Sequence, residues 1–187
     1  MKYELTNETH PSYSILYRIR ALRDIPERGV KSGDLGGWVE SELNLSPSGA
    51  AWVSGDAQVY GNARVYGNAW VAGDARVFGD ARVAGSAWVA DNARVAGSAW
   101  VADSARVFGD AWVADSAWVF GDARVSGDAS VYGDARVYDN ARVFGGAQVY
   151  GNARVYGNAW VSGNAWVSGT AWVYAARHVA TVGPVGS

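Results

Sequence analysis

Residues 61–78 read GNARVYGNAWVAGDARVF, three consecutive copies of a six-residue unit with the consensus Gly-(Asp/Asn/Ser)-Ala-x-Val-x. The unit repeats without an inserted or deleted residue from Gly49 to Tyr174, so it accounts for 126 of the 187 positions. Every copy carries Ala at its third place and Val at its fifth. Strict repetition at a short period indicates stacked repeats, each of which buries surface only against its neighbours.

Within each unit, Ala and Val alternate with variable residues, which is the period-two pattern of a short half-buried strand. The Gly-Asn or Gly-Asp pair supplies a corner, because glycine adopts positive φ freely and Asn and Asp tolerate it better than most residues. Strands this short pair with the coils above and below them, about 4.8 Å away. The repeat therefore predicts an all-β, single-stranded parallel β-helix over 49–174.

The outward residue before each Val indicates how many hexads form one coil. Its identity weakly favours three hexads, which predicts a triangular prism of about seven regular 18-residue coils. At that spacing Trp100 would lie against Trp118 and Arg64 against Arg82 in adjacent coils. One wall would carry Trp and then Arg along its length: Trp52, Trp70, Trp88, Arg106, Arg124 and Arg142.

Both ends depart from the repeat. Residues 1–48 are predicted to form an N-terminal cap and an irregular first coil, in which 16–22 is amphipathic and reads as a strand or a short helix. A cap is expected because an open coil would expose unpaired backbone to other chains. Residues 35–40 already have hexad form, and Pro47 and Ser48 are two extra residues before the regular array. Residues 175–187 read as a C-terminal tail.

The register of 65–70, Val-Tyr-Gly-Asn-Ala-Trp, resembles the hexapeptide-repeat proteins that form left-handed triangular β-helices. This resemblance implies the left hand. The N-terminal segments 19–24, 30–33, 36–39 and 44–46 are more specifically similar to YdcK-type hexapeptide-repeat proteins of enterobacteria and prophages. Phage-type sequences of this kind continue past a segment like 182–187 into a further small domain, so the resemblance implies that this chain is a truncated version.

The hexapeptide-repeat superfamily contains trimeric acyltransferases, which use a histidine base at a subunit interface, and γ-type carbonic anhydrases, which hold a metal with three histidines. The hexads contain no histidine; His10 lies in the cap and His178 in the tail, and the chain has no cysteine. We therefore expect a non-catalytic protein without a cofactor or a metal. An acyltransferase-like enzyme with His178 as its base is the less favoured alternative.

Acidic residues recur at the corners, and they could also be read as carboxylate pairs or calcium ligands. Asp, Asn and Ser interchange freely at these places, as turn chemistry requires, and the nine-residue glycine-rich pattern of calcium-binding β-rolls is absent. We interpret them as structural; they include Asp74, Asp80, Asp110, Asp122, Asp128 and Asp134.

The outward position before Val holds nine Trp and nine Arg, and Tyr or Phe often follows Val. These side chains could cover their own walls, for example through a cation–π contact between Arg136 and Tyr138. Three walls of this kind nevertheless exceed what a monomer usually exposes, and Trp, Tyr and Arg are enriched at interfaces. We therefore predict a homo-oligomeric scaffold, with a trimer favoured by the resemblance. The candidate interface residues are Trp88, Trp100, Trp112, Trp118, Phe108 and Phe120.

The alternative binding prediction is sequestration of a small planar anion, such as a signalling nucleotide, in clefts between subunits. In a phage setting this would remove a host signalling molecule. Guanidinium groups suit phosphate and aromatic rings suit bases. Extended nucleic acid is disfavoured, because acidic corners flank every Arg. The candidate ligand-binding residues are Arg106, Arg124, Arg142, Arg136, Arg154, Tyr138 and Tyr156.

Composition narrows the remaining classes. The formal net charge is −2 and the pI is about 5.6, so the chain lacks the basic footprint of a general nucleic-acid or anionic-membrane binder. The sequence shows no long apolar run and no secretory leader. The expected location is the cytoplasm, and the host cytoplasm if a phage encodes the protein.

Overall fold

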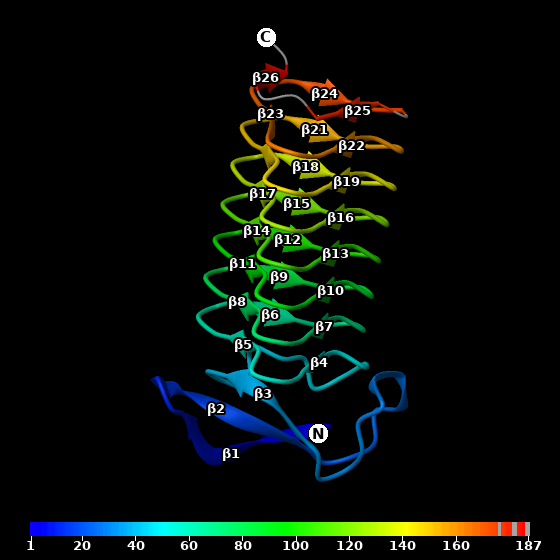
Figure 1. Ribbon diagram of the computed structural model, residues 1–187. Coiled ribbons are helices and arrows are strands. Elements are labelled where there is room, and N and C mark those ends of the chain that lie inside the picture. The colour runs from blue at the N-terminus through cyan, green and yellow to red at the C-terminus, as the bar shows by residue number, and fades with distance from the viewer. Residues whose placement is uncertain (176, 181–182, 186–187) are drawn as a thin grey trace.

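The computed structural model, which describes residues 1–175, 177–180 and 183–185, is an all-β parallel solenoid (Figure 1). Three consecutive hexads complete one regular coil, and each such coil adds one short strand to each of three parallel walls. This confirms the expected prism-like parallel β-helix, with an irregular coil before the seven regular ones and a partial coil after them. The left hand stays a prediction of the resemblance.

The three walls are named here in chain order. Wall A consists of β4 (Trp52–Val53), β7 (Trp70–Val71), β10 (Trp88–Val89), β13 (Arg106–Val107), β16 (Arg124–Val125), β19 (Arg142–Val143), β22 (Trp160–Val161) and β25 (His178–Val179). Wall B consists of β3 (Leu35–Val39), β5 (Gln58–Val59), β8 (Arg76–Val77), β11 (Arg94–Val95), β14 (Trp112–Val113), β17 (Ser130–Val131), β20 (Gln148–Val149), β23 (Ala165–Val167) and β26 (Gly183–Val185). Wall C consists of β6 (Arg64–Val65), β9 (Arg82–Val83), β12 (Trp100–Val101), β15 (Trp118–Val119), β18 (Arg136–Val137), β21 (Arg154–Val155) and β24 (Trp172–Val173).

Neighbouring strands in a regular wall are three hexads apart along the chain, as the outward pattern predicted. Trp52 pairs with Trp70, and Trp100 pairs with Trp118. The first coil is longer, since Val39 of β3 pairs with Val59 of β5. Two additional residues, the number contributed by Pro47 and Ser48, thus enter the first coil and leave the later register unchanged.

The inward Ala and Val columns form the core. Their side chains are 0% exposed throughout the array from Ala51 to Val167, and only the last coil begins to open, where Val173 is 2% exposed. Burying a Val side chain contributes roughly 1.5–3 kcal/mol, so this column is the main stabilising feature of the solenoid.

The corners require a backbone that glycine adopts readily. The first corner residue has φ between +58° and +72° throughout the array, and four corners carry Asp there instead of Gly. Each of these Asp side chains accepts a hydrogen bond from the backbone N–H of the glycine one coil above; the Oδ2 atom of Asp103, for instance, lies 3.1 Å from the nitrogen of Gly121. The bond offsets the cost of a left-handed conformation at a residue other than glycine. This supports a structural role for the four carboxylates at the first corner place, which are those of Asp91, Asp103, Asp115 and Asp139.

The N-terminal segment forms an antiparallel hairpin, β1 (Tyr3–His10) and β2 (Tyr13–Ala21), followed by a short 3₁₀ helix η1 (Pro26–Arg28). The amphipathic stretch 16–22 is therefore almost entirely strand, with its Leu16 and Ile19 side chains buried. The hairpin lies across the N-terminal end of the solenoid in Figure 1, and β2 continues the sheet of wall B through β3.

Side chains of the cap complete the hydrogen bonds that a preceding coil would have made. The ammonium of Lys2 donates to the carbonyl of Ala51 at 2.6 Å, and the amide of Asn44 donates to the carbonyl of Ala63 at 2.9 Å. Both side chains are fully buried. Burial, with the nearby charges of Arg23 and Arg28, lowers the pKa of Lys2 to about 8.

Candidate functional site: the aromatic and arginine columns

Two outward columns run along each wall, one from the residue before Val and one from the residue after it. On wall C the residues before Val are Arg64, Arg82, Trp100, Trp118, Arg136, Arg154 and Trp172. The residues after Val on this wall are Tyr66, Ala84, Ala102, Phe120, Tyr138, Tyr156 and Tyr174. Wall C thus brings together seven of the sequence-predicted residues: Trp100, Trp118, Phe120, Arg136, Tyr138, Arg154 and Tyr156.

The column after Val forms a continuous aromatic stack on the C-terminal half of wall C. The rings of Phe120 and Tyr138 are 5.0 Å apart with an angle of 2° between their planes, and Tyr138 and Tyr156 repeat this geometry. Tyr174 extends the stack at 5.5 Å. Burial raises the pKa of the Tyr138 hydroxyl, and the adjacent Tyr156 raises it further, so the hydroxyl is neutral in physiological buffers.

Two arginines in the C-terminal half of this wall, Arg136 and Arg154, lie over tryptophan rings. The guanidinium of Arg136 is 5.1 Å from the ring centre of Trp118, and that of Arg154 is 5.3 Å from Trp172. The expected contact of Arg136 with Tyr138 was wrong. The reason is that strand neighbours in a stack are only about 4.8 Å apart, whereas residues i and i+2 along one strand are separated by roughly 7 Å.

Trp100 and Trp118 meet edge to face, with ring centres 5.1 Å apart. Together with Phe120 and Ala102 they line an apolar hollow of about 150 Å³ on wall C. Trp118 is 38% exposed and Trp172, higher on the same wall, is 57% exposed. Wall C therefore offers large aromatic surface in a rigid arrangement.

On wall A, the structure stacks the predicted arginines Arg106, Arg124 and Arg142 in consecutive coils. The guanidinium groups of the first and last arginine lie over tryptophan rings of the adjoining coils. That of Arg106 is 5.9 Å from the ring centre of Trp88 in the coil below, and that of Arg142 is 5.1 Å from the ring centre of Trp160 in the coil above. Arg124 remains exposed between them. Within the described part of the chain, none of the three forms an ion pair with a carboxylate.

The remaining predicted interface residues are spread over different walls. Trp88 and Phe108 lie together on wall A with ring centres 6.5 Å apart, whereas Trp112 lies on wall B and is 51% exposed. The six candidates therefore do not form one surface.

Sequence reasoning missed a belt of three exposed tryptophans around one coil near the C-terminal end. Trp160, Trp166 and Trp172 lie one on each wall and are 42–57% exposed. Their spacing of one hexad could have predicted this belt, because consecutive hexads lie on consecutive walls of one coil.

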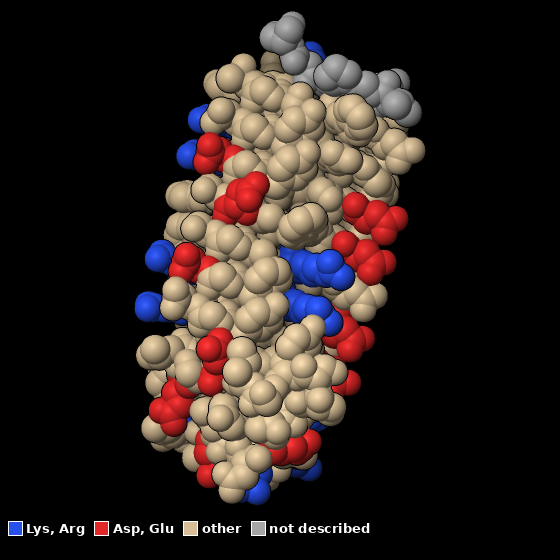
Figure 2. Space-filling model, turned by 90° about the vertical axis from the view of Figure 1, so that its left-hand side faces the viewer, with Lys and Arg blue, Asp and Glu red and all other residues tan. Residues whose placement is uncertain are grey.

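One face of the solenoid carries rows of charged side chains with uncharged residues between them (Figure 2). Figure 2 shows the left-hand side of Figure 1, where Asp and Glu side chains lie in rows along the solenoid and some Lys or Arg side chains lie near the middle of the face.

Comparison with known families agrees with this architecture. The repeat family described as YdcK beta solenoid repeat matches residues 57–73, 75–90, 135–148 and 147–163. The chain is a β-solenoid repeat protein. The matched segments contain parts of all three walls, which supports assignment to a β-solenoid repeat family. No protein with a curated description matches the chain.

In this solenoid, His10 and His178 lie at opposite ends of the molecule, in β1 and β25 (Figure 1). His178 accepts or donates a hydrogen bond with Ser162, whose Oγ atom is 2.7 Å from its Nε2 atom. Among the described residues there is no group of three or more His, Cys, Asp or Glu side chains placed to hold a metal ion. None of the helices in the described part of the chain is long and apolar enough to cross a membrane. Parts of the predicted tail, 176, 181–182 and 186–187, lie outside the described residues.

Proposed function

We propose that this solenoid is a non-catalytic scaffold that self-associates through wall C and presents its remaining walls to a partner protein. The observation that carries the proposal is the aromatic surface of wall C, where the stacked column from Phe120 to Tyr174 lies beside the exposed rings of Trp118 and Trp172. Interfaces are enriched in Trp, Tyr and Arg, and rigid aromatic side chains lose little conformational entropy on binding. A trimer is the proposed assembly, following the superfamily resemblance.

Two further features support a scaffold rather than an enzyme. The two histidines are far apart, and four corner carboxylates are occupied by hydrogen bonds to the next coil. A general acid–base pair needs two groups within reach of one substrate. The proposed location is the cytoplasm, which is the host cytoplasm if a phage encodes the chain.

The oligomeric state in solution tests this proposal. In native mass spectrometry, Trp100→Glu combined with Trp118→Glu should yield monomers, because two buried carboxylates would replace apolar contacts across the interface. Trp112→Glu is the matched control, since this exposed tryptophan lies on wall B and its replacement should leave the oligomer intact.

Circular dichroism would establish that the variants are folded. Trp172→Glu provides a second test on wall C at a more exposed position, where the change costs the monomer little. Variants that remain assembled at the wild-type mass, or a wild-type protein that is monomeric at micromolar concentration, would exclude wall C as an assembly surface.

A second candidate function is sequestration of a small planar anion on wall A. It is favoured by the stack of Arg106, Arg124 and Arg142, which has no carboxylate partner in the described residues and is bounded by the rings of Trp88 and Trp160. Guanidinium groups bind phosphate and the rings could stack on a base. On wall C both Arg136 and Arg154 lie over tryptophans, which favours packing for them, whereas on wall A Arg124 has no such contact with any described ring.

Native mass spectrometry of protein purified from cells would detect a retained small molecule. For a defined probe, isothermal titration calorimetry with AMP should show binding that Arg106→Glu combined with Arg124→Glu abolishes. Equal affinity in the wild type and this double variant would rule out the arginine stack as the binding site.

A further inference from the structure

The N-terminal cap covers the lower ends of two walls and leaves the third open. On wall A, Arg28 of η1 lies over Trp70, and on wall B the ring of Tyr13 lies beneath the guanidinium of Arg76. Wall C begins only at β6, and below β6 the chain makes a single bridge, from Leu45 to Val65. A groove therefore opens where wall C starts.

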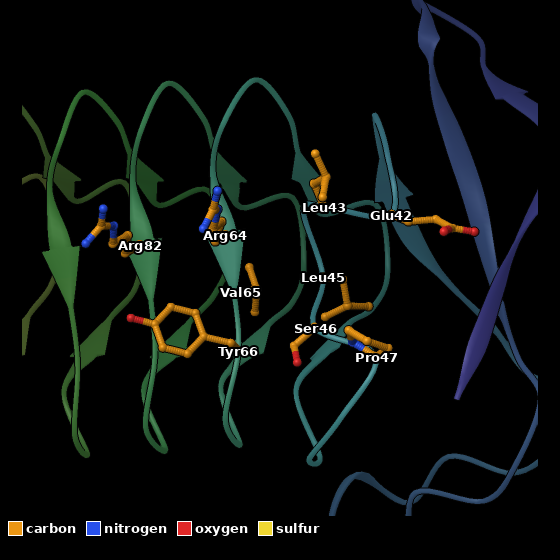
Figure 3. A pocket seen from close by; sticks show the side chains of 9 residues that line it. All are labelled: Glu42, Leu43, Leu45, Ser46, Pro47, Arg64, Val65, Tyr66 and Arg82. Carbon is orange, nitrogen blue, oxygen red and sulfur yellow. The ribbon is translucent and has the colours of Figure 1, made fainter. Parts of the chain in front are cut away.

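This groove has a volume of about 490 Å³ and is shown in Figure 3. Its exposed apolar side chains are those of Leu43 and Pro47, and the fully buried Leu45 and Val65 lie beneath them. Its polar side chains come mainly from wall C and are those of Arg64, Tyr66 and Arg82, together with Ser46 and Glu42. A volume of this size lies within the usual range for small-molecule sites.

Arg64 and Arg82 form the charged part of the groove. They are register partners in β6 and β9, so their backbones are one coil apart, and Figure 3 shows their side chains on neighbouring coils. Both are exposed. Among the described residues, neither guanidinium forms a hydrogen bond, an ion pair or a contact over an aromatic ring.

This lack of partners distinguishes Arg64 and Arg82 from the other arginine pairs. Wherever two arginines are register partners elsewhere in the described chain, at least one guanidinium lies over an aromatic ring. The nearby carboxylates are also directed elsewhere. Asp80 accepts a hydrogen bond from Asn62 at 2.9 Å, and the carboxylate of Glu42 points away from both guanidinium groups in Figure 3.

We infer that this groove binds a small organic anion, in which a phosphate or carboxylate group contacts Arg64 and Arg82 and an attached flat apolar group lies against Tyr66, Leu43 and Pro47. Guanidinium groups from neighbouring coils can both donate to the oxygens of one anionic head group, and such charge-assisted bonds are among the strongest polar contacts. The apolar lining would make the organic part contribute to affinity. The groove lies at the N-terminal end of wall C, before the aromatic surface from Trp100 to Tyr174 that is proposed for assembly, and it is separate from the arginine stack on wall A.

Calorimetric titration with phenyl phosphate tests the site, with inorganic phosphate as the comparison. We expect saturable binding of one phenyl phosphate per chain, tighter than that of inorganic phosphate. Arg64→Gln and Arg82→Gln should each weaken binding about tenfold or more, because a charged hydrogen-bonding partner contributes about 1.5–3 kcal/mol. Titration with benzoate shows which head group the site prefers. Affinity similar to that of phenyl phosphate would indicate a general anion site, and much weaker affinity would indicate a phosphate-selective site.

Arg94→Gln is the matched control, since it removes an exposed arginine from the same kind of column on wall B, outside both proposed anion sites. Its affinity for phenyl phosphate should equal that of the wild type. Chemical shift changes confined to 42–47, 64–66 and 82 would place the ligand in the groove. The inference is wrong if phenyl phosphate shows no saturable binding, or if Arg94→Gln weakens binding as much as Arg64→Gln does.

Discussion

The inward valine column can be tested at Val113, in the middle of the solenoid. Its side chain is 0% exposed, and its register partners in the coils below and above are Val95 and Val131. Val113→Ala removes two methyl groups from a position that water does not reach and that neighbouring coils cannot easily collapse to fill.

The expected loss can be built from two contributions. Removing the two methyl groups forfeits about 1.6 kcal/mol of transfer free energy, at about 0.8 kcal/mol for each buried carbon. The space left behind adds roughly 1 kcal/mol, because a core relaxes only partly around a cavity. We therefore expect Val113→Ala to destabilise its coil by about 2–3 kcal/mol. Val113→Asp should cost several kcal/mol, since it would bury a carboxylate without a partner.

Native-state hydrogen exchange is the suitable assay, because coils in a solenoid contact only their nearest neighbours and open locally. Protection should fall in β11, β14 and β17, while strands several coils away, such as β23, keep their exchange rates. Ser130→Ala is the matched control in the next strand of wall B, where the side chain points outward and the change should stay within about 0.5 kcal/mol.

Two results would refute this reasoning. If Val113→Ala changed protection no more than Ser130→Ala, the inward column would not be the main source of stability. If protection fell equally in all coils, the solenoid would unfold as one cooperative unit, and the assumption of local, nearest-neighbour stability would be wrong.

Three further predictions concern the corners and the cap. Gly85→Ala should destabilise the solenoid by about 1–3 kcal/mol more than Gly61→Ala in urea unfolding. A Cβ added at Gly85 would lie 2.7 Å from the backbone nitrogen of Asp103, whereas one added at Gly61 would come no closer than 3.2 Å, to the carbonyl oxygen of Gly79. The similar φ of the two glycines makes the conformational cost common to both. Asp103→Ala should speed hydrogen exchange at the amide of Gly121 and Asp103→Asn should not, because only the asparagine keeps an oxygen acceptor. Equal exchange rates at Gly121 in the two variants would contradict the side-chain hydrogen bond. Between pH about 8 and 10.5, the stability of the wild type relative to Lys2→Met should rise with pH. The reason is that the folded protein has released the Lys2 proton in this range while the unfolded chain still holds it. If the difference in thermal stability between the two proteins stayed flat or fell with pH, this proton would not be lost on folding.

Most of the fold could be predicted from the sequence, because the deciding pattern is local. The alternation of Ala and Val with polar or aromatic residues fixes which side chains face inward in every hexad, and the structure places them at 0% exposure through most of the array. The cap was harder. The stretch 16–22 fits a strand or a short helix by pattern alone, and only its pairing with β1 and β3 decides for a strand.

The candidate sites depended on contacts that no local pattern specifies. The residues before Val could be assigned to walls once three hexads per coil were assumed, and this placed Arg106 next to Arg124 correctly. The partner of Arg136 could not be read in this way, because the guanidinium reaches either the next outward residue of its own strand or a ring one coil away. The tertiary spacing makes Trp118 the nearer ring.

What the sequence determined by itself is therefore the solenoid: the strands, the corners and the inward columns follow from a six-residue repeat in which each position has one steric role. What only the tertiary structure decided is which outward side chains become neighbours and where the surface stays open. Lys2 and Asn44 reach the carbonyls of Ala51 and Ala63, and the groove at Arg64 exists because the cap covers walls A and B but not the start of wall C. These features arise from contacts between distant parts of the chain, whose distances depend on how the coils and the cap pack together.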